Sequence, residues 1–427
     1  MHQTPDTGKI VWYRWIDHVE RLEMYRTGGY HPVMIDDELN NRYRVVDKLG
    51  WGGYSVVWLA HDTWNQRFVA LKVCTANGEV ARREPRILRD LSTHAHQDLI
   101  PAVLDEFVLH GPNGQHVCYS LPPAQGDLGE ASFSRLFSLE VARILAARLC
   151  IAVRHVHSKG YVHGDIHLRN ALSTLPSSLD HMTISAFREK YGEPETEQVR
   201  RRDGQPLTEN VPAKAVIPLN LGKRADQYTT TDAAGLMLSD FGEAFRPSNE
   251  QRLGRDCHVP LLKRAPETFF EPDEPLSFGS DIWSLGVAIW DLVAMKTLFA
   301  EMEPPDEIVA EQIEVLGADG FPKEWQEKFD SPVVLGVGEG QAFPRRPGGE
   351  REVWPTLEEA FESSVQNYRK DEKNIGLIGV EEKEAILRLL RRMLVFKPNE
   401  RISASEVLAS EWMVKWALPE LQRAQHG

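Results

Sequence analysis

The spacing of apolar residues divides the chain into a first part typical of β-strands and a longer part typical of helices. Apolar and polar residues alternate in residues 43–50, and β-branched or aromatic runs follow at residues 55–60 and 68–73. After about residue 138, apolar residues recur at helical spacing. The recurring positions are Leu145, Leu149, Val153 and Val156. The pattern therefore predicts a small antiparallel sheet followed by a mainly helical region.

Three segments depart from this pattern and set the expected organisation. Residues 1–41 are rich in aromatic residues and are expected to pack as an extension on the domain of residues 42–124. The helical domain is expected over residues 125–418, interrupted at 173–237 by prolines among polar residues. This composition permits an ordered lid, a docking arm or a localisation spacer. A second Gly/Pro-rich stretch, residues 335–355, predicts a long loop.

Composition narrows the class of protein. The 427 residues are 42% hydrophobic and 26% charged, which indicates a globular enzyme or binding protein. A net charge of −14 argues against nucleic-acid binding and suits cationic partners, although most carboxylates are expected to be solvated surface. The apolar stretch at 282–295 is shorter than the roughly 18 residues of a membrane span and contains Asp291. We expect no membrane association.

Cysteine spacing and the start of the chain bear on its location. The four cysteines lie far apart and form no C-x-x-C pair, so neither a disulfide framework nor a zinc site is expected. The sequence begins without a basic segment followed by an apolar one, and residue 2 is not the glycine that myristoylation needs. We expect a reducing compartment, cytoplasmic, nuclear or both.

A glycine-rich run joins two of the predicted strands. Gly50, Gly52 and Gly53 would let the backbone close over phosphates without Cβ clashes, although a G-x-G turn is often an ordinary hairpin. The next predicted strand reads Val-Ala-Leu-Lys at 69–72, where Lys72 could present an ammonium to the α- and β-phosphates. The pair together indicates a nucleotide site.

Further chemistry-bearing residues follow in a fixed order. In the run 163–170, Asp165 precedes Asn170 by five residues, the spacing of a catalytic loop with a hydroxyl-orienting carboxylate and a metal-binding amide. Asp240 then stands before Phe-Gly, and the runs Ala-Pro-Glu at 265–267 and Asp-Ile-Trp-Ser-Leu-Gly at 281–286 come after it. Each of these motifs alone is a weak signal, but chance is a poor explanation for all of them occurring in this order.

These motifs resemble those of the eukaryotic protein kinases, over roughly residues 40 to 418. The sequence of residues 28–33, 41–52 and 58–60 resembles that of the serine/arginine-protein kinases (SRPK-like). Residues 191–195 and 203–204 resemble the sequences of fungal members of this family. The resemblance implies an α+β bilobal kinase fold, with a small antiparallel β-sheet lobe bearing one helix and a larger, mainly helical lobe. It also implies ATP and Mg²⁺ as cofactors.

The resemblance assigns roles by position. Lys72 would hold phosphates, Asp165 would act as the base, and Asn170 and Asp240 would bind magnesium. Glu267 would pair with Arg401, and Asp281 would brace the catalytic loop. The nucleotide-binding positions implied are Leu49, Gly50, Trp51, Gly52, Gly53, Tyr54, Ser55, Val57, Ala70, Lys72, Glu84, Leu121 as gatekeeper, and Pro122 and Ala124 in the hinge. Pro122 keeps its carbonyl and Ala124 its N–H, so the adenine contacts survive.

The sequence departs from the kinase pattern at three places. His167 stands where kinases usually carry a catalytic lysine; a neutral imidazole can still donate a hydrogen bond. Pro85 follows Glu84, the expected partner of Lys72, so that either the helix begins late or Glu84 is displaced and Glu79 replaces it. Gly164 replaces the arginine that reads an activation-loop phosphate.

Between Asp240 and Glu267 the only hydroxyl residue is Ser248. Because this segment has one possible phosphorylation site and the arginine that would bind a phosphate is replaced by Gly164, we expect the segment to be ordered without phosphorylation.

Glu307 and Glu314 match the acidic docking positions of the resembled family. They lie seven residues apart and would share one face of a helix, with Asp306 and Glu311 nearby. A basic Arg-Ser substrate could be steered there, although a solvated acidic face is the commoner meaning of such a pattern.

The sequence leaves three functions to compare. The first is an ATP- and magnesium-dependent serine/threonine kinase, expected to be a monomer, that acts on Arg/Ser-rich proteins such as splicing factors. The second, motivated by His167 and Pro85, is a weak or inactive pseudokinase that serves as a binding scaffold. The third is a small-molecule phosphotransferase, because His-Gly-Asp-Ile-His also occurs in such enzymes; Arg401 and the motifs at 265–267 and 281–286 argue against it.

Overall fold

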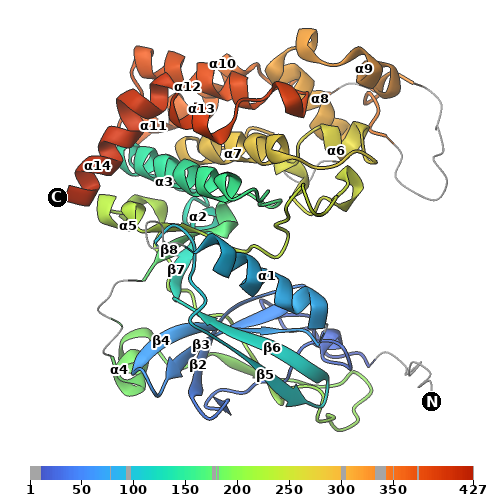
Figure 1. Ribbon diagram of the computed structural model, residues 1–427, viewed down its shortest axis with the longest axis vertical. Helices are drawn as coiled ribbons and strands as arrows, with labels where there is room; N and C mark the ends of the chain where they lie inside the picture. The colour runs from blue at the N-terminus through green and yellow to red at the C-terminus, as the bar shows by residue number, and fades with distance from the viewer. Residues whose placement is uncertain are drawn as a thin grey trace. The chain divides into compact units, whose positions relative to one another are not determined.

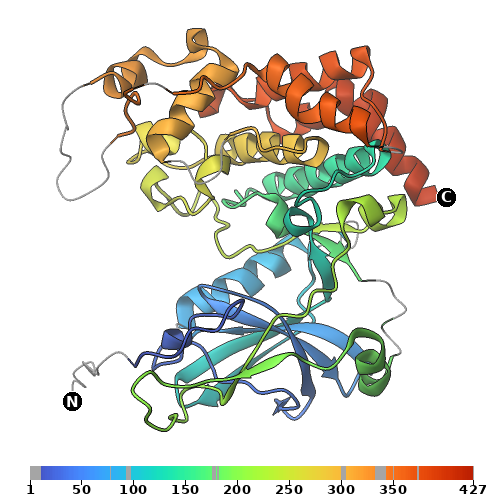
Figure 2. The same ribbon diagram turned by 180° about the vertical axis from the view of Figure 1, so that it is seen from behind.

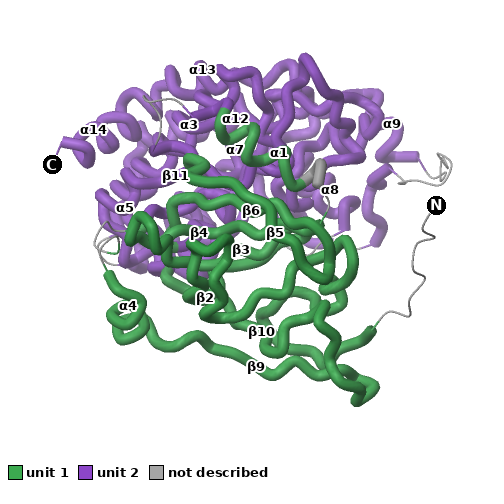
Figure 3. Tube along the Cα trace, turned by 60° about the horizontal axis from the view of Figure 1, so that its bottom comes forward, with its two compact units in different colours: residues 1–89, 101–125, 175–221 green, residues 90–100, 126–174, 222–427 purple. Residues whose placement is uncertain are grey.

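The computed structural model describes residues 11–76, 78–92, 98–175, 179, 182–299, 304–331, 343–349, 351–372 and 375–426, without the side chains of residues 78–80. The chain forms two compact units (Figure 3). Unit 1 comprises residues 1–89, 101–125 and 175–221, and unit 2 comprises residues 90–100, 126–174 and 222–427. The predicted α+β class, with a sheet unit and a larger helical unit, is confirmed.

Unit 1 is built on a six-stranded antiparallel sheet in the order β1-β2-β3-β4-β6-β5 (Figure 1). Helix α1 (Gly78–Leu91) lies beside this sheet. The strands are β1 (Glu38–Leu39), β2 (Tyr43–Gly52), β3 (Ser55–Asp62), β4 (Arg67–Cys74), β5 (Asp105–Gly111) and β6 (Gly114–Leu121). The three runs predicted as strands therefore form β2, β3 and β4.

The N-terminal segment, residues 11–41, is part of the core of unit 1. It contributes several buried side chains, namely Tyr13, Ile16, Val19, Leu22, Tyr25, Tyr30 and Val33. It also supplies Glu20, whose Oε2 lies 2.6 Å from the Lys48 Nζ on β2, with both side chains only 1% exposed. Burial lowers the pKa of Lys48, and the neighbouring Glu20 opposes this effect.

Most of the inserted segment also belongs to unit 1. Residues 175–221 carry α4 (Ile184–Tyr191) and a small ribbon of β9 (Thr196–Gln198) and β10 (Lys214–Val216), and run along the sheet (Figure 2). The Leu219 N–H donates to the Lys48 carbonyl over 2.7 Å. Phe187 is 1% exposed and its ring lies 5.0 Å from that of Phe68.

This location differs from the sequence expectation, which followed chain order and placed the whole of 173–237 in the helical domain. The segment packs on unit 1 because a few apolar residues in its mostly polar sequence are buried in the core of that unit, namely Val199, Val211, Ala215 and Val216.

Unit 2 contains the longest helices. α3 (Leu139–Ser158) begins where the Ser138 hydroxyl accepts from the Val141 N–H, and it contacts α7 (Phe278–Val293), in which twelve residues are buried. The other helices are α2 (Leu128–Ala131), α5 (Thr230–Ala234), α6 (Glu267–Phe270), α8 (Pro305–Leu316), α9 (Lys323–Phe329), α10 (Leu357–Phe361), α11 (Asn367–Asp371), α12 (Val380–Met393), α13 (Ala404–Leu408) and α14 (Leu418–His426).

A short sheet in unit 2 lies next to the segments that contain Asp165, Asn170 and Asp240. β8 (Ala171–Thr174) pairs antiparallel with β11 (Leu236–Leu238), so that Ala171 lies opposite Leu238. The chain passes from unit 1 to unit 2 within β7 (Ala124–Asp127). Within the described ranges, no helix is both long and apolar enough to cross a bilayer.

Candidate active site

The predicted site residues form two groups, one in each unit. In unit 1, the Lys72 Nζ on β4 lies 2.6 Å from the Glu84 Oε2 on α1. The Tyr119 hydroxyl on β6 donates to the same Glu84 oxygen over 2.7 Å. Tyr119 belongs to none of the sequence motifs, although strand alternation from the predicted gatekeeper Leu121 places it on the same face.

Pro85 does not displace Glu84. Helix α1 begins at Gly78, and Pro85 lies in its interior, so the helix neither starts late nor loses its glutamate. Proline removes one backbone hydrogen bond. The contacts of Glu84 with Lys72 and Tyr119, together with the buried Ile87 and Leu88, outweigh that loss. The alternative partner Glu79 has a side chain outside the described set.

Several predicted nucleotide-binding positions share one face of the sheet. Val57 lies opposite Lys72, and Ala70 lies opposite Leu121. Because residues two apart on a strand point to the same side, the side chains of Val57, Ala70 and Leu121 lie around Lys72 on that face. Pro122 and Ala124 follow directly at the end of β6.

The glycine-rich run forms a hairpin between β2 and β3, in which Gly52 pairs with Ser55 around Gly53 and Tyr54. A Cβ added at Gly50, Gly52 or Gly53 would meet no atom within 4 Å. The fold of unit 1 therefore leaves open space at these glycines, which fits close approach of a phosphate chain. The other predicted residues of this run are Leu49, partly buried, and Trp51 and Tyr54, both exposed.

An unpredicted residue supports this hairpin. The hydroxyl of the buried Tyr30 donates to the Gly52 carbonyl over 2.7 Å. Burial and the nearby Glu20 raise the pKa of Tyr30 to about 12, so the phenol remains a donor at neutral pH. Sequence spacing gave no signal for this contact because it joins positions 22 residues apart through an irregular segment.

In unit 2, the catalytic loop brings three predicted residues together. The Asn170 Nδ2 donates to the Asp165 carbonyl over 2.9 Å and to Asp165 Oδ2 over 3.0 Å. The His167 Nε2 lies 3.3 Å from Asp165 Oδ1. Despite this proximity, Asp165 Oδ1 is buried without a hydrogen-bond partner among the described residues. The Asp165 side chain as a whole is 17% exposed, so its carboxylate is accessible to a substrate hydroxyl.

The ladder between β8 and β11 positions the predicted metal-binding residues. The Ser239 N–H and hydroxyl both donate to the Asn170 carbonyl, over 2.8 and 2.9 Å, and Asp240 follows with a φ of 58°. Because the Asn170 amide nitrogen faces Asp165, its amide oxygen is the atom offered to a cation. In the described part of the chain, no three acidic, His or Cys side chains form a cluster that could hold a metal ion.

Two structural pairs implied by the sequence are present. Asp281 on α7 accepts from the backbone N–H groups of His163 and Gly164, over 2.7 and 2.9 Å, and thereby fixes the catalytic loop. The guanidinium of Arg401 binds both oxygens of Glu267, over 2.8 and 2.6 Å.

The segment between Asp240 and Glu267 is held by contacts of its own. Glu243 pairs with Arg252 and, over 3.0 Å, with His258. Gly164 has a φ of 78°, and a Cβ there would approach the Glu243 carbonyl to 3.0 Å, so an arginine at this position would be strained. These contacts hold the segment through its own side chains.

The predicted acidic pair lies on α8, and a cation occupies it. The Arg351 Nε lies 2.8 Å from the Glu307 Oε2, and its Nη1 contacts the Glu314 Oε1. One guanidinium bridges both carboxylates, so they share a face as expected. Asp306 accepts from the backbone N–H of Arg345 over 3.0 Å. Glu311 is only 3% exposed, so the expectation that it adds to the acidic surface is wrong.

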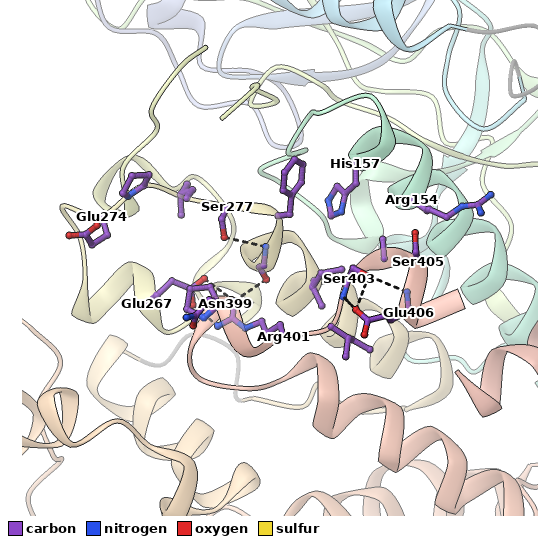
Figure 4. Close-up of a pocket in the computed structure, with 18 of the residues that line it drawn as sticks. Arg154, His157, Glu267, Glu274, Ser277, Asn399, Arg401, Ser403, Ser405 and Glu406 are labelled. Atoms are coloured by element: carbon purple, nitrogen blue, oxygen red, sulfur yellow. Dashed lines mark hydrogen bonds and ion pairs between the residues drawn. The ribbon is translucent and has the colours of Figure 1, made fainter. Parts of the chain in front are cut away.

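Unit 2 also contains a cavity of about 900 Å³ (Figure 4). It is bordered by Glu267, Arg401 and the helix-capping residues Ser277 and Ser403. None of the predicted catalytic or metal-binding residues lines it. Within its lining, Glu267 pairs with Arg401, and Ser403 pairs with Glu406 in a helix cap.

Comparisons with known proteins agree with this geometry. Residues 43–181 and 226–413 match the protein kinase domain family. A serine/threonine protein kinase of Aspergillus fumigatus is 27% identical over 420 residues, covering 92% of this chain and 90% of the relative. Protein kinase dsk1 of Schizosaccharomyces pombe is 37% identical over 196 residues, covering 42% of this chain and 35% of that protein.

SRSF protein kinase 3 of Homo sapiens is 44% identical over 104 residues, covering 23% of this chain and 18% of that protein. A crystallised kinase domain superimposes with a TM-score of 0.57 at 17% identity, covering 90% of this chain and 98% of the other, which supports the fold.

The chain belongs to the protein kinase family. Its relatives include fungal serine/threonine kinases and SRPK-like kinases, and its enzyme class is that of the serine/threonine protein kinases. The small-molecule phosphotransferase reading is thereby excluded. The family match omits residues 182–225, which lie mostly in the inserted part of unit 1.

Proposed function

We propose that this kinase transfers the γ-phosphoryl group of ATP to serine, and secondarily threonine, in Arg/Ser-rich proteins such as splicing factors. The observation that carries the substrate class is the guanidinium seated between Glu307 and Glu314 on α8. Two carboxylates spaced to bind one arginine side chain are suited to arginine-rich segments. The name of one relative, SRSF protein kinase 3, supports the same class.

The residues of this chain have separable parts in the transfer. ATP with Mg²⁺ supplies the activated phosphoryl group and neutralises its charge. Asp165, whose side chain is 17% exposed, accepts the hydrogen of the serine hydroxyl and orients its oxygen. Asn170 and Asp240 would hold the metal ions, and Lys72, fixed by Glu84, would hold the phosphates.

His167 motivates the second candidate, a pseudokinase that binds partners without turnover. Its Nε2 lies 3.3 Å from Asp165 and 3.3 Å from the Asn170 Nδ2. An imidazole here can donate a hydrogen bond to Asp165 or to a phosphoryl oxygen, whereas a lysine would bring a fixed positive charge. We favour the active enzyme because Asp165 and Asn170 keep their mutual contacts beside this histidine.

The test is transfer from ATP with Mg²⁺ to an (Arg-Ser)₄ peptide, compared with a (Lys-Ser)₄ peptide of equal charge. The wild-type kinase is expected to prefer arginine, and Asp165→Asn is expected to lower kcat by about 10²-fold or more. A matched control is Asp226→Asn, a carboxylate in unit 2 outside both site groups that pairs with Arg224.

Transfer that is absent for both peptides, while His167→Lys restores it, would favour the pseudokinase. Equal use of both peptides would contradict the proposed substrate class while leaving the kinase activity intact. The expected monomeric state, the cytoplasmic or nuclear location and the absence of nucleic-acid binding stay predictions.

A further inference from the structure

The acidic pair on α8 is held by an arginine of the same chain. Arg351 follows the run Pro344-Arg-Arg-Pro-Gly-Gly, so this part of the polypeptide resembles an arginine-rich peptide in composition. Its guanidinium reaches Glu307 and Glu314 together. The side chains of these three residues are 19%, 27% and 21% exposed, so the pair is half-buried rather than fully solvated.

The backbone around Arg351 fastens the segment to the same helix. The Trp354 N–H donates to the Glu314 Oε2 over 2.8 Å, so both carboxylate oxygens of Glu314 are engaged. The Trp354 indole donates to the Leu298 carbonyl over 2.8 Å. On the other side of Arg351, the Arg345 N–H donates to Asp306 over 3.0 Å. The segment thus crosses the acidic face of α8 with an anchor on each side.

The electrostatics favour occupation by a cation. Burial alone would lower the pKa of Arg351, but the hydrogen bonds that its guanidinium donates to Glu314 and Glu307 outweigh this effect and raise the pKa. Two carboxylates around one guanidinium leave the site acidic by one charge, and a second guanidinium cannot make the same contacts while Arg351 remains.

We propose that Arg351 acts as an internal competitor, held in place by the described residues 343–349 and 352–354 on either side of it, and that it takes the place that an arginine of the substrate would take between Glu307 and Glu314. This inference rests on the proposed function, because it assigns the acidic pair to substrate arginine. A substrate must displace Arg351 to dock, so the segment raises the substrate concentration needed for half-maximal rate and leaves the chemical step unchanged.

The first test compares Arg351→Ala with the wild-type kinase on the (Arg-Ser)₄ peptide. We expect KM to fall about 5-fold with kcat unchanged, since a partly exposed ion pair stabilises by about 1 kcal/mol. Arg346→Ala is the matched control, because it removes the same charge from the same segment, but its partner is Asp330. Its KM is expected to change less than about 2-fold.

A second measurement reports on the internal contact without substrate. Arg351→Ala, Glu314→Gln and the double variant form a thermodynamic cycle for unfolding. A coupling of about 3-fold or more in the unfolding equilibrium constant is expected if the pair forms in solution. No coupling would overturn the inference, whatever the peptide kinetics show.

The outcomes separate the inference from the proposed function. If Glu314→Gln raises the peptide KM but Arg351→Ala does not lower it, the acidic pair binds substrate and the internal competitor is overturned. If Glu314→Gln leaves the peptide KM unchanged while the unfolding cycle shows coupling, the pair is a structural contact. The docking role in the proposed function then fails, and the competitor with it.

Discussion

At the scale of single residues, the ion pair of Glu267 and Arg401 shows how a motif can serve stability rather than chemistry. Arg401 is completely buried and donates to both Glu267 oxygens and to the carbonyls of Val395, Phe396 and Gly279. Removing one partner of such a pair leaves a desolvated, uncompensated charge.

Arg401→Ala is therefore expected to lower the free energy of unfolding by about 3–5 kcal/mol. Chemical denaturation with intrinsic tryptophan fluorescence would measure this loss. Arg423→Ala, which breaks an exposed pair with Glu420, is the control and should cost about 1 kcal/mol or less. Similar losses for both variants would contradict the structural role assigned to Arg401.

Histidines in unit 1 predict a dependence of stability on pH. Burial and the neighbouring His116 lower the pKa of His31 to about 4, from an ordinary value of 6.5, and burial also lowers the pKa of His116. Unfolding therefore takes up protons between about pH 6.5 and 4, so stability is fully present above pH 6.5 and falls as pH drops through this window.

His31→Gln is expected to make this acid-side loss shallower, by up to about 1.4 kcal/mol per pH unit where one proton is taken up. Unfolding curves at pH 8, 6 and 4.5 would show it. Above pH 7 the variant and the wild type should have parallel pH profiles. An acid limb as steep as that of the wild type, or of the exposed His426→Gln control, would refute the assignment.

At the scale of elements, helix α1 keeps its function although a proline interrupts its hydrogen bonds. Pro85 is buried in the helix interior, and the adjacent Glu84 still binds Lys72. Restoring the missing N–H at this position should favour the helix.

Pro85→Ala is expected to raise the free energy of unfolding by about 1–3 kcal/mol with kcat nearly unchanged. Thermal unfolding and peptide phosphorylation would be measured on the same preparation. Pro85→Gly, which regains the N–H but not the helix propensity, should gain about 1 kcal/mol less. A destabilised alanine variant would show that the proline ring is needed for packing.

The segment between Asp240 and Glu267 predicts activity that is independent of phosphorylation. Its ordering contacts, those of Glu243 with Arg252 and His258, involve no phosphate. Treatment with a broad-specificity phosphatase should leave kcat within about 2-fold of a mock-treated sample, and Ser248→Ala should behave likewise. Activity that disappears after treatment would refute this prediction.

Sequence reasoning succeeded where a feature is local. Strand alternation found β2, β3 and β4, and short motifs placed Asp165 beside Asn170 and Lys72 beside the glycine hairpin. The predicted pair of Lys72 and Glu84 is present, but the expectation that Pro85 would delay the helix start or displace Glu84 is wrong, because the tertiary contacts of Glu84 override a local helix preference. Sequence reasoning missed Tyr30 and Arg351, whose contacts join irregular segments without any periodic signal.

At the scale of the whole molecule, the inserted segment behaves as part of unit 1 rather than as a detached spacer. Its apolar residues are few, but α4 places Phe187 against Phe68 of the sheet. Of the three roles that composition left open, a flexible localisation spacer is therefore disfavoured for residues 184–221.

Phe187→Ala is expected to lower the free energy of unfolding by about 3–5 kcal/mol, because it leaves a cavity at the sheet. Glu189→Ala, an exposed change on the same helix, is the control and should fall within about 0.5 kcal/mol of the wild type. Equal stability of the two variants would show that α4 contributes nothing to unit 1.

The buried contact between Glu20 and Lys48 affects how this enzyme can be shortened. A chain cut at residue 43, where the family match begins, would retain every catalytic motif. It would also leave the Lys48 ammonium desolvated without its carboxylate, and would remove the hydroxyl that holds Gly52. The boundary recognised by homology and the boundary required for charge compensation therefore differ by more than twenty residues, and we expect only a fragment that keeps Glu20 to retain the full stability of unit 1.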